Sequence, residues 1–464
     1  MTNKNDLLMA YYGDDFTGST DALEFLSRAG IKTVLFIEPP TPAQLQKYKG
    51  LQAIGVAGMT RSMSPADMEK TLQPAFEALK ASGARHIHYK VCSTFDSSPV
   101  IGSIGKAIDT GVSVFNAAFV PLLVAAPALG RYCVFGNLFA RMGIGSLGQI
   151  FRLDRHPSMS KHPVTPADEG DLRLHLAKQT KRRIGLLDIL QVVKSETEAI
   201  EKLDSLLETG AEIVLFDALY EDQLFRIGQL IDSYADDKPL FSVGSSGVEM
   251  ALGKYWNALG LLAPYANWKH PGAVKPLLVI SGSCSPVTSA QIDWALSNGF
   301  ADIAIDTTTI ATNNDATDLL NIYIDIATGL IDKGTSVIIH TSRGNDDPRM
   351  NSSNAVLAER GLSRSEINAE TSRLYGTALG VIARGIAGRT AIKRLLIAGG
   401  DTSSFAARAM GIEAVEMIAP ISPGAPLCKA HAPDSPIDNL EVNFKGGQVG
   451  VESYFELVLK GGDK

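Results

Sequence analysis

Two carboxylates near the start of the chain are of a type and spacing that could carry out chemistry. Asp14 and Asp15 stand in the run Tyr-Tyr-Gly-Asp-Asp-Phe-Thr-Gly-Ser-Thr-Asp at 11–21, directly after the apolar residues 7–10. Such a pair could hold a metal ion, a substrate hydroxyl group or a proton. Both are also good turn and N-cap residues for the helix predicted to follow, so a functional and a structural interpretation stay open here.

Further polar side chains follow later apolar runs in the same half of the chain. Arg61 comes shortly after 53–58, and 86–91 contains Lys90 and leads to Ser93. An arginine can hold a carboxylate through two parallel hydrogen bonds, although Arg61 alone could equally be a solvated surface residue. If these groups meet the two aspartates, they form a pocket for an anion that carries hydroxyl groups.

The second half of the chain has glycine- and serine-rich turns in place of acids and bases. One turn, 281–285, follows the apolar run 276–280, and another, 399–402, follows 395–398. Backbone N–H groups in a turn of this kind, at the start of a helix, can hold phosphate. The spacing of a P-loop is absent. Asp401 could hold magnesium or a ribose, or it could be the N-cap of the next helix.

Each of these polar turns follows a predicted strand and precedes a predicted helix, which is typical of an α/β fold. Ligands bind at the carboxyl ends of the strands in such folds. At 464 residues the chain exceeds one ordinary core. We therefore predict two α/β domains with mainly parallel sheets and an active-site cleft between them. The first domain covers 1–262 and binds a small polar substrate, 263–275 is a linker, and 276–464 binds a nucleotide.

Composition excludes several other classes of protein. Hydrophobic residues make up 45% of the chain, charged residues 20%, and the net charge of -7 comes without a long charged block. This argues against nucleic acid as a partner. No apolar run reaches the roughly 20 residues that span a bilayer, and the polar residues 1–6 lack a signal-peptide core. These features predict a cytoplasmic protein with no membrane partner, and they leave open whether it forms a homo-oligomer.

Cysteine and histidine spacing predicts no metal site. The four cysteines, Cys92, Cys133, Cys284 and Cys428, are far apart and lack any C-x-x-C pair, which indicates neither zinc nor a disulfide framework. His86 and His88 alternate along one predicted strand and are expected to be core or edge residues. The glycine-rich, proline-broken stretch 131–166 is predicted to be a lid or a binding loop.

Several motifs together resemble the four-carbon acid sugar kinase family, formerly a domain of unknown function, over essentially the whole length. The motifs are Gly13-Asp14-Asp15-Phe16-Thr17-Gly18, Tyr89-Lys90-Val91-Cys92-Ser93-Thr94-Phe95-Asp96, Asp154-Arg155-His156-Pro157, Ser281-Gly282-Ser283, Gly399-Gly400-Asp401-Thr402, Pro423-Gly424 and Lys445-Gly446-Gly447. Threonate-type members often carry an aspartate where this chain has Cys92. The Cys-Ser-Thr-Phe-Asp form is closer to the 3-oxo-tetronate and other 3-oxo-sugar-acid kinases.

The resemblance implies ATP-dependent phosphorylation of a hydroxyl group on a short sugar acid, with Mg²⁺ as cofactor. Candidate substrates are a 3-oxo-tetronate, threonate or erythronate, or a branched acid such as 3-oxo-isoapionate. It matches Asp15, Arg61, Lys90 and Ser93 to the family's substrate site. Our mechanistic hypothesis makes Asp15 the catalytic base, and we predict Asp14 as a further substrate-binding residue. The implied nucleotide-binding residues are Ser281, Gly282, Ser283, Gly399, Gly400, Asp401, Thr402, Gly424, Gly446 and Gly447.

An oxidoreductase and a non-catalytic binding protein are the two alternatives to a kinase. An NAD-dependent oxidoreductase of a hydroxy acid would need a G-x-G-x-x-G turn that opens a helix after a strand. Residues 143–148 fit those letters but follow no clear strand, so we interpret the match as chance. A non-catalytic sugar-acid binding protein would need no glycine-rich second half and would usually be exported.

Overall fold

The computed structural model describes residues 7–142, 148–162, 164–235, 238–313, 315–344 and 346–462, without the side chain of Ser365. The described chain forms two compact units, 1–266 and 267–464. The unit boundary falls inside the predicted linker. Most of the letters of the G-x-G-x-x-G match, 143–147, lie outside the described residues.

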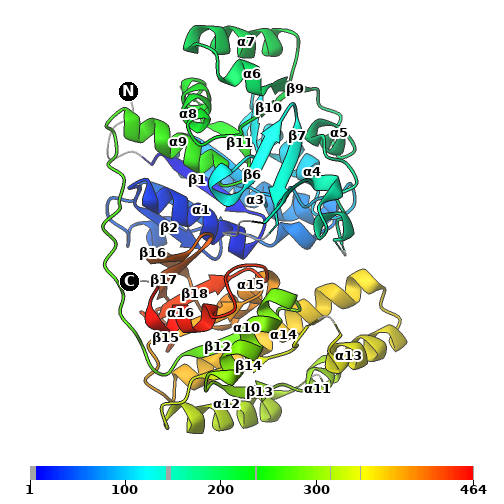
Figure 1. The fold of residues 1–464 in the computed structure, drawn as a ribbon, viewed down its shortest axis with the longest axis vertical. Coiled ribbons are helices and arrows are strands. Elements are labelled where there is room, and N and C mark those ends of the chain that lie inside the picture. The colour runs from blue at the N-terminus through cyan, green and yellow to red at the C-terminus, as the bar shows by residue number, and fades with distance from the viewer. Residues whose placement is uncertain are drawn as a thin grey trace. The chain divides into compact units, whose positions relative to one another are not determined.

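The first unit is built on a parallel sheet (Figure 1). Its strands, in spatial order, are β2 (Thr33–Phe36), β3 (Ala53–Ala57), β1 (Met9–Gly13), β4 (His86–Lys90), β11 (Leu240–Gly244), β5 (Val120–Leu123), β10 (Ile213–Phe216) and β9 (Ile184–Leu187). The seven strands from β2 to β10 are fully buried, as expected for a sheet covered on both faces, and the edge strand β9 is partly buried.

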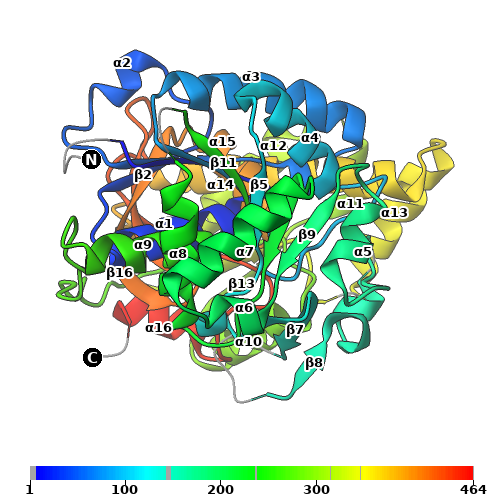
Figure 2. The ribbon, with the colours of Figure 1, turned by 90° about the horizontal axis from the view of Figure 1, so that it is seen from above.

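Helices cover both faces of this sheet (Figure 2). Helices α1 (Phe16–Arg28), α8 (Gln223–Ser233) and α9 (Gly247–Ala258) pack on one face, and α3 (Pro65–Ala81) packs with α4 (Ile104–Phe115) on the other. The remaining helices of this unit are α2 (Pro42–Leu45), α5 (Leu172–Ala177), α6 (Ile189–Val192) and α7 (Glu196–Glu208).

The register of the central strands brings their carboxyl ends level with one another. Gly13 of β1 lies opposite both Ala57 of β3 and Lys90 of β4, and Lys90 in turn lies opposite Gly244 of β11. The chain fills the β2–β3 side of β1 first and then crosses to β4. The turns after β1, β3 and β4 therefore meet at a switch point of the sheet, where α/β folds bind ligands.

The stretch 131–166 differs from the predicted lid or loop. It contains a small antiparallel sheet of β6 (Arg131–Val134), β7 (Asn137–Arg141) and β8 (Ile150–Arg152). A groove of about 820 Å³ lies on this sheet, lined by residues that include Tyr132, Phe139 and Ile150. Burial alternates along β6 and β7, but the residue types at 131–141 do not alternate between apolar and polar, so the sequence carried no clear strand signal here. Whether the segment also serves as a binding element stays a prediction.

The second unit has its own mainly parallel sheet. Its strands, in spatial order, are β13 (Ala301–Ala304), β14 (Val337–His340), β12 (Leu278–Ser281), β15 (Arg394–Ala398), β18 (Glu441–Lys445), β17 (Ala425–His431) and β16 (Ala414–Ser422). Only β17 runs against its two neighbours. The switch point lies between β12 and β15, because the chain first fills the β14 side of β12 and then crosses to β15.

The helices of the second unit include a long pair, α14 (Arg364–Ala387) and α15 (Gly400–Ala409), that pack together. The others are α10 (Pro286–Ser297), α11 (Thr307–Thr312), α12 (Thr317–Ile331), α13 (Pro348–Glu359) and α16 (Tyr454–Lys460). In the described part of the chain, none of the helices combines the length and the apolar character that crossing a membrane requires. The predicted α/β class with mainly parallel sheets is confirmed.

Candidate active site

Asp14, Asp15 and Arg61 form one ion-pair cluster at the switch point of the first unit. Arg61 Nε and Nη2 donate to the two oxygens of Asp14 at 3.1 and 2.7 Å, and Nη1 donates to Asp15 Oδ2 at 2.7 Å. Arg61 follows β3 and the aspartates follow β1, so tertiary structure brings together residues that are 46 positions apart. The alternative that Arg61 is a solvated surface residue is wrong.

Asp15 is held in one orientation by three donors. Its Oδ1 accepts from the backbone N–H of Gly18 at 2.7 Å, and its Oδ2 accepts from Thr17 Oγ1 at 2.8 Å as well as from Arg61. The bond from Gly18 makes Asp15 the N-cap of α1. The structural interpretation of Asp15 is therefore confirmed. The functional one stays a prediction, since a carboxylate that caps a helix and contacts the arginine can still take part in chemistry.

Lys90 brings a second cation to the same place. A Cβ atom built on Gly18 would lie 2.6 Å from Asp15 Oδ1, 3.3 Å from Lys90 Nζ and 3.6 Å from Arg61 Nη2, so the three groups surround this glycine. Lys90 is only 1% exposed. Its Nζ donates to Val91 O at 3.0 Å and lies 3.6 Å from Asp21 Oδ2. Nearby carboxylates, with Asp21 first among them, outweigh burial and raise the pKa of Lys90.

Three buried residues on the helix side of Lys90 were not predicted from the sequence: Asp21, Ser246 and Glu249. Asp21 lies on α1 and accepts from Ser246 Oγ at 2.6 Å. Glu249, in the first turn of α9, is fully buried, and its Oε1 lies 3.6 Å from His88 Nε2. Burial raises the pKa of Glu249 to about 8, although Lys90 opposes that shift. The signal for this group was present, because Asp21 ends the first motif and Ser246 lies in the small-residue turn after β11.

Ser93, the remaining predicted substrate residue, lies in the turn after β4. It is nearly buried, and the structure describes no hydrogen bond from its side chain to the Asp15, Arg61 and Lys90 cluster. His86 and His88 are core residues, as expected: His86 Nε2 lies 3.0 Å from Asp232 Oδ1, and His88 Nδ1 lies 3.0 Å from Ser242 Oγ. Among the described residues, no three His, Cys, Asp or Glu side chains gather into a metal site.

In the second unit, the turns after β12, β15 and β18 pack tightly against one another. A Cβ on Gly282 would lie 2.2 Å from Thr402 Oγ1, and a Cβ on Gly447 would lie 2.8 Å from Ser283 Oγ. Gly399 has φ +124° and would place its Cβ 2.7 Å from the same Thr402 oxygen. These three glycines therefore let the Thr402 and Ser283 side chains approach the backbone of the neighbouring turns closely.

These turns offer hydrogen-bonding groups that suit an anion. The side-chain oxygen of Ser281 is buried and has no hydrogen-bond partner in the described chain. Helix α15 begins at Gly400, and the N–H groups at the start of a helix have no partner within the helix itself. Asp401 lies in that first turn, and Gly399 is the N-cap. The alternative of Asp401 as the N-cap is therefore wrong.

Gly446 and Gly424 lie at the same edge of the second sheet. Gly446 directly follows β18. Gly424 has φ +80° and precedes β17. Because β17 is antiparallel to β18, with Leu427 opposite Asn443, the start of β17 lies beside the end of β18. The turn before β17, which contains Gly424, thus lies at this edge together with the turns after β12, β15 and β18. The sequence pointed to Gly424 but did not predict the antiparallel direction of β17.

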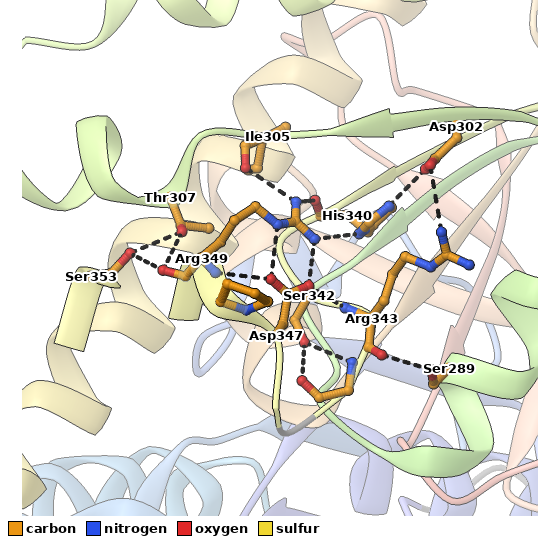
Figure 3. A network of polar contacts seen from close by, with 12 residues as sticks. Ser289, Asp302, Ile305, Thr307, His340, Ser342, Arg343, Asp347, Arg349 and Ser353 are labelled. Carbon is orange, nitrogen blue, oxygen red and sulfur yellow. Dashed lines mark hydrogen bonds and ion pairs between the residues drawn. The ribbon is translucent and has the colours of Figure 1, made fainter. Parts of the chain in front are cut away.

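A polar network fixes the turn after β14, the neighbour of β12 (Figure 3). Arg349 donates to both oxygens of Asp347, at 3.0 and 2.7 Å, and to the backbone oxygens of Ile305 and His340, each at 3.2 Å. His340 Nε2 lies 2.7 Å from Asp302 Oδ1. Burial lowers the pKa of His340, which suits the neutral ring. The network thus holds one side of the Ser281 turn in place, since Thr341 N donates to Ser281 O at 3.0 Å.

Comparison with known proteins identifies the family of this chain. Residues 9–252 match the family model of a sugar-binding N-terminal domain, and residues 278–455 match that of a nucleotide-binding C-terminal domain. A 3-oxo-isoapionate kinase from Paraburkholderia graminis is 41% identical over 456 residues, which cover 98% of this chain and 94% of that protein. The chain belongs to the four-carbon acid sugar kinase family.

More distant relatives agree with this assignment. A 3-oxo-tetronate kinase from Cupriavidus necator is 28% identical, with 98% of this chain and 96% of that protein covered. A solved structure from Salmonella typhimurium LT2, described as a tRNA synthase, shares the fold with a TM-score of 0.73 at 24% identity, covering 97% of this chain and 98% of that one. The predicted family and the enzyme class of sugar-acid kinase are confirmed, in preference to an oxidoreductase or a non-catalytic binding protein.

Proposed function

We propose that this member of the four-carbon acid sugar kinase family transfers the γ-phosphoryl group of ATP to a hydroxyl group of a 3-oxo sugar acid. The observation that carries the proposal is the meeting of Asp15, Arg61 and Lys90 at one switch point. This arrangement combines a proton acceptor with two cations. The higher identity to a 3-oxo-isoapionate kinase than to 3-oxo-tetronate kinases makes 3-oxo-isoapionate the first substrate to test.

Arg61 is suited to binding the substrate carboxylate. Its guanidinium group has five N–H donors, and three of them contact Asp14 and Asp15 in the described structure. The other two, one on each Nη, are available to a carboxylate, and the side chain is 26% exposed. In this proposal Lys90 supplies a second positive charge from the buried side, and Ser93 and Asp14 complete the substrate site.

Asp15 is the proposed base. The substrate hydroxyl oxygen attacks the γ-phosphorus, the bond from that phosphorus to the β,γ-bridging oxygen breaks, and ADP leaves. Asp15 takes the hydroxyl proton, as a catalytic aspartate does in other kinases. Gly18, Thr17 and Arg61 hold the Asp15 carboxylate in one orientation. The carboxylate therefore does not have to rotate before it accepts the proton, and such pre-positioning lowers the barrier to the reaction.

The turns of the second unit are proposed to hold the triphosphate. Ser281 Oγ and the N–H groups of Gly400 and Thr402 donate to phosphate oxygens, and Gly282, Gly424, Gly446 and Gly447 allow the backbone to approach. Mg²⁺ is typically held by one or two carboxylates together with substrate phosphates. Asp401 is the residue of the 399–402 turn that could offer such a ligand, and bound Mg²⁺ would neutralise charge on the phosphates.

An ADP-release assay over tetronates, 3-oxo-tetronates and branched 3-oxo acids tests this function. We expect turnover with one 3-oxo acid and its loss in Asp15→Asn, with ATP binding by calorimetry unchanged. Wild-type activity in that variant would remove Asp15 from the role of base. A thermal shift with NAD but not with ATP and Mg²⁺ would overturn the kinase proposal itself.

A further inference from the structure

Lys445, the last residue of β18, is a buried lysine without a carboxylate partner. Its side chain is 0% exposed. Its Nζ donates to Thr288 Oγ1 at 2.8 Å and lies 5.9 Å from the centre of the Tyr454 ring. No ion pair to Lys445 exists among the described residues. The other buried lysine, Lys90, differs in having Asp21 beside it.

The groups that face Lys445 from each neighbouring element are uncharged. Thr288 faces it from α10 and Tyr454 from α16, and the Tyr454 hydroxyl group donates to Asn443 Oδ1. The strand register brings the start of β17, at Ala425, next to it. The carboxylate in the first turn of α15, Asp401, accepts from Ser372 Oγ at 3.3 Å and forms no ion pair with Lys445 among the contacts described. Burial without a counter-charge lowers the pKa of Lys445 to about 7.

Lys445 is connected to the proposed phosphate-binding turns through short links. Its carbonyl oxygen accepts from the backbone N–H of Gly399 at 2.9 Å. Thr288, which accepts from the ammonium group, donates to Gly447 O at 2.9 Å. A second observation also points to a ligand here, because Ser281 Oγ is buried and unpartnered two strands away, with β15 between β12 and β18.

We propose that Lys445 is the counter-charge for the phosphates of the bound nucleotide, and that nucleotide binding takes up a proton at this lysine. The inference rests on the proposed function and deepens it. An isolated buried charge is unfavourable, so the neutral amine is favoured when the site is empty. Phosphate charge in a site of low polarity stabilises the ammonium form, and this stabilisation is the reason for the coupling.

The sign of the pH dependence follows from this coupling. At pH 6 the lysine is protonated with and without nucleotide, so no proton is taken up. At pH 8 the empty site holds mostly neutral Lys445 and the occupied site holds the ammonium form, so uptake approaches one proton. Nucleotide affinity should then fall by up to about tenfold for each pH unit above 7.

Calorimetric titration with ADP and Mg²⁺ tests the inference on the full chain. Titrations at pH 8, in buffers with different ionisation enthalpies, count the protons taken up on binding, since ADP itself is fully ionised there. We expect uptake in the wild type and none in Lys445→Met or Lys445→Arg. Lys445→Arg should bind ADP with an affinity that is independent of pH from 7.5 to 9. Lys460→Met, at an exposed position on α16, should behave as the wild type.

Separate outcomes distinguish a failure of this inference from a failure of the kinase proposal. ADP binding by the wild type without proton uptake would overturn the role of Lys445, and so would uptake that persists in Lys445→Met. An affinity loss in Lys445→Met that is the same at every pH, with no uptake in the wild type, would indicate a purely structural lysine. If neither variant folds, the wild-type proton count still decides. An absence of nucleotide binding would overturn the proposed function instead.

Discussion

At the scale of single residues, the candidate active site is a set of charges held by one another. Arg61 contacts two carboxylates, and Lys90 lies between the Asp15 cluster and the buried Asp21 and Glu249. In this arrangement each group fixes its neighbour's position and its protonation state. Changing one charge should therefore have a specific effect on substrate binding or on the dependence of stability on pH.

Arg61→Lys should weaken substrate binding selectively. Lysine keeps the positive charge, but its single nitrogen cannot make the two parallel hydrogen bonds to one carboxylate that a guanidinium group makes. Loss of a charged hydrogen-bonding pair of this kind corresponds to about 1.5–3 kcal/mol, or roughly a 10- to 100-fold rise in the KM for the sugar acid. The KM for ATP should stay within about twofold. Arg28→Lys, at a partly exposed arginine that pairs with the buried Glu24 on α1, is the control. Equal changes in both KM values would contradict the prediction.

Glu249→Gln should stabilise the first unit more strongly as pH rises. Burial raises the pKa of Glu249 from 4.5 to about 8 in the folded chain. An unfolded glutamate ionises near pH 4.5, so between pH 4.5 and 8 the folded state holds a proton that the unfolded state has lost. The wild type therefore loses stability over this window, by up to about 1.4 kcal/mol per pH unit, whereas the variant does not.

Urea unfolding at pH 5, 6.5 and 8 measures this difference. Glu249→Gln and the wild type should have similar stability at pH 5, and the variant should be the more stable protein at pH 8. The carboxyl group of Glu249 is surrounded by Lys90, Asp21 and His88, so both proteins should keep these three residues as in the wild type. Exposed Glu201→Gln is the control. A constant difference at all three pH values would show that Glu249 does not titrate as described.

At the scale of elements, both units place their candidate residues at a switch point of a parallel sheet. Strand register sets the carboxyl ends of β1, β3 and β4 level in the first unit, and those of β12 and β15 level in the second. Helices α1 and α15 then start from these edges, with Asp15 and Gly399 as their N-caps. In the second unit, the close approach of neighbouring turns depends on glycine.

Gly282→Ala should impair nucleotide binding. The added Cβ would meet Thr402 Oγ1 at 2.2 Å, so the Ser281 turn and the 399–402 turn must move apart. Overpacking of this kind is worth about 1–3 kcal/mol, which corresponds to roughly a 5- to 100-fold rise in the KM for ATP. Gly329→Ala, on an exposed face of α12 with nothing near its Cβ, is the control.

A compensating change makes the Gly282 prediction stricter. In Gly282→Ala combined with Thr402→Ala, the clashing oxygen is gone, so thermal stability should return toward the wild-type value. If the single variant binds ATP normally, or if the double variant is less stable than the single one, the packing of these two turns does not have the role assigned to it.

At the scale of the whole molecule, the chain divides into two compact units, and we expect each to have its own thermal transition. In the second unit, the buried Arg394 ties the chain together. It pairs with Glu441 at 2.6 Å and donates to the backbone oxygens of Val458 at 2.6 Å, Leu459 at 3.2 Å and Gly272 at 3.1 Å. Arg394 thus links three parts of the unit through hydrogen bonds and an ion pair: its first residues, β18 and α16.

Arg394→Met should destabilise the second unit by about 3–5 kcal/mol, because it leaves a carboxylate and several carbonyl oxygens without their donor. Scanning calorimetry should show a lower transition temperature for the second unit and an unchanged one for the first. Arg389→Met, at an exposed ion pair of the same unit, should have little effect. Equal shifts of both transitions would mean that the two units unfold together.

Local sequence was sufficient to predict the family, the enzyme class, the α/β fold and most strand-and-turn positions. Buried parallel strands are visible in the sequence as short apolar runs, and the turns that follow them are visible as clusters of glycine, serine and aspartate. These signals lie within a few consecutive residues. The small sheet of 131–152 and the reversed strand β17 were missed, because pairing direction depends on partners far along the chain.

Tertiary structure decided which side chains meet and what their charges become. It joined Arg61 to two aspartates, added Asp21, Ser246 and Glu249 beneath Lys90, and left Lys445 buried without a counter-ion. Residue type determines which charges a chain can carry. Burial and neighbours determine which of them it does carry, because desolvation and nearby charges exist only once the strands are placed side by side.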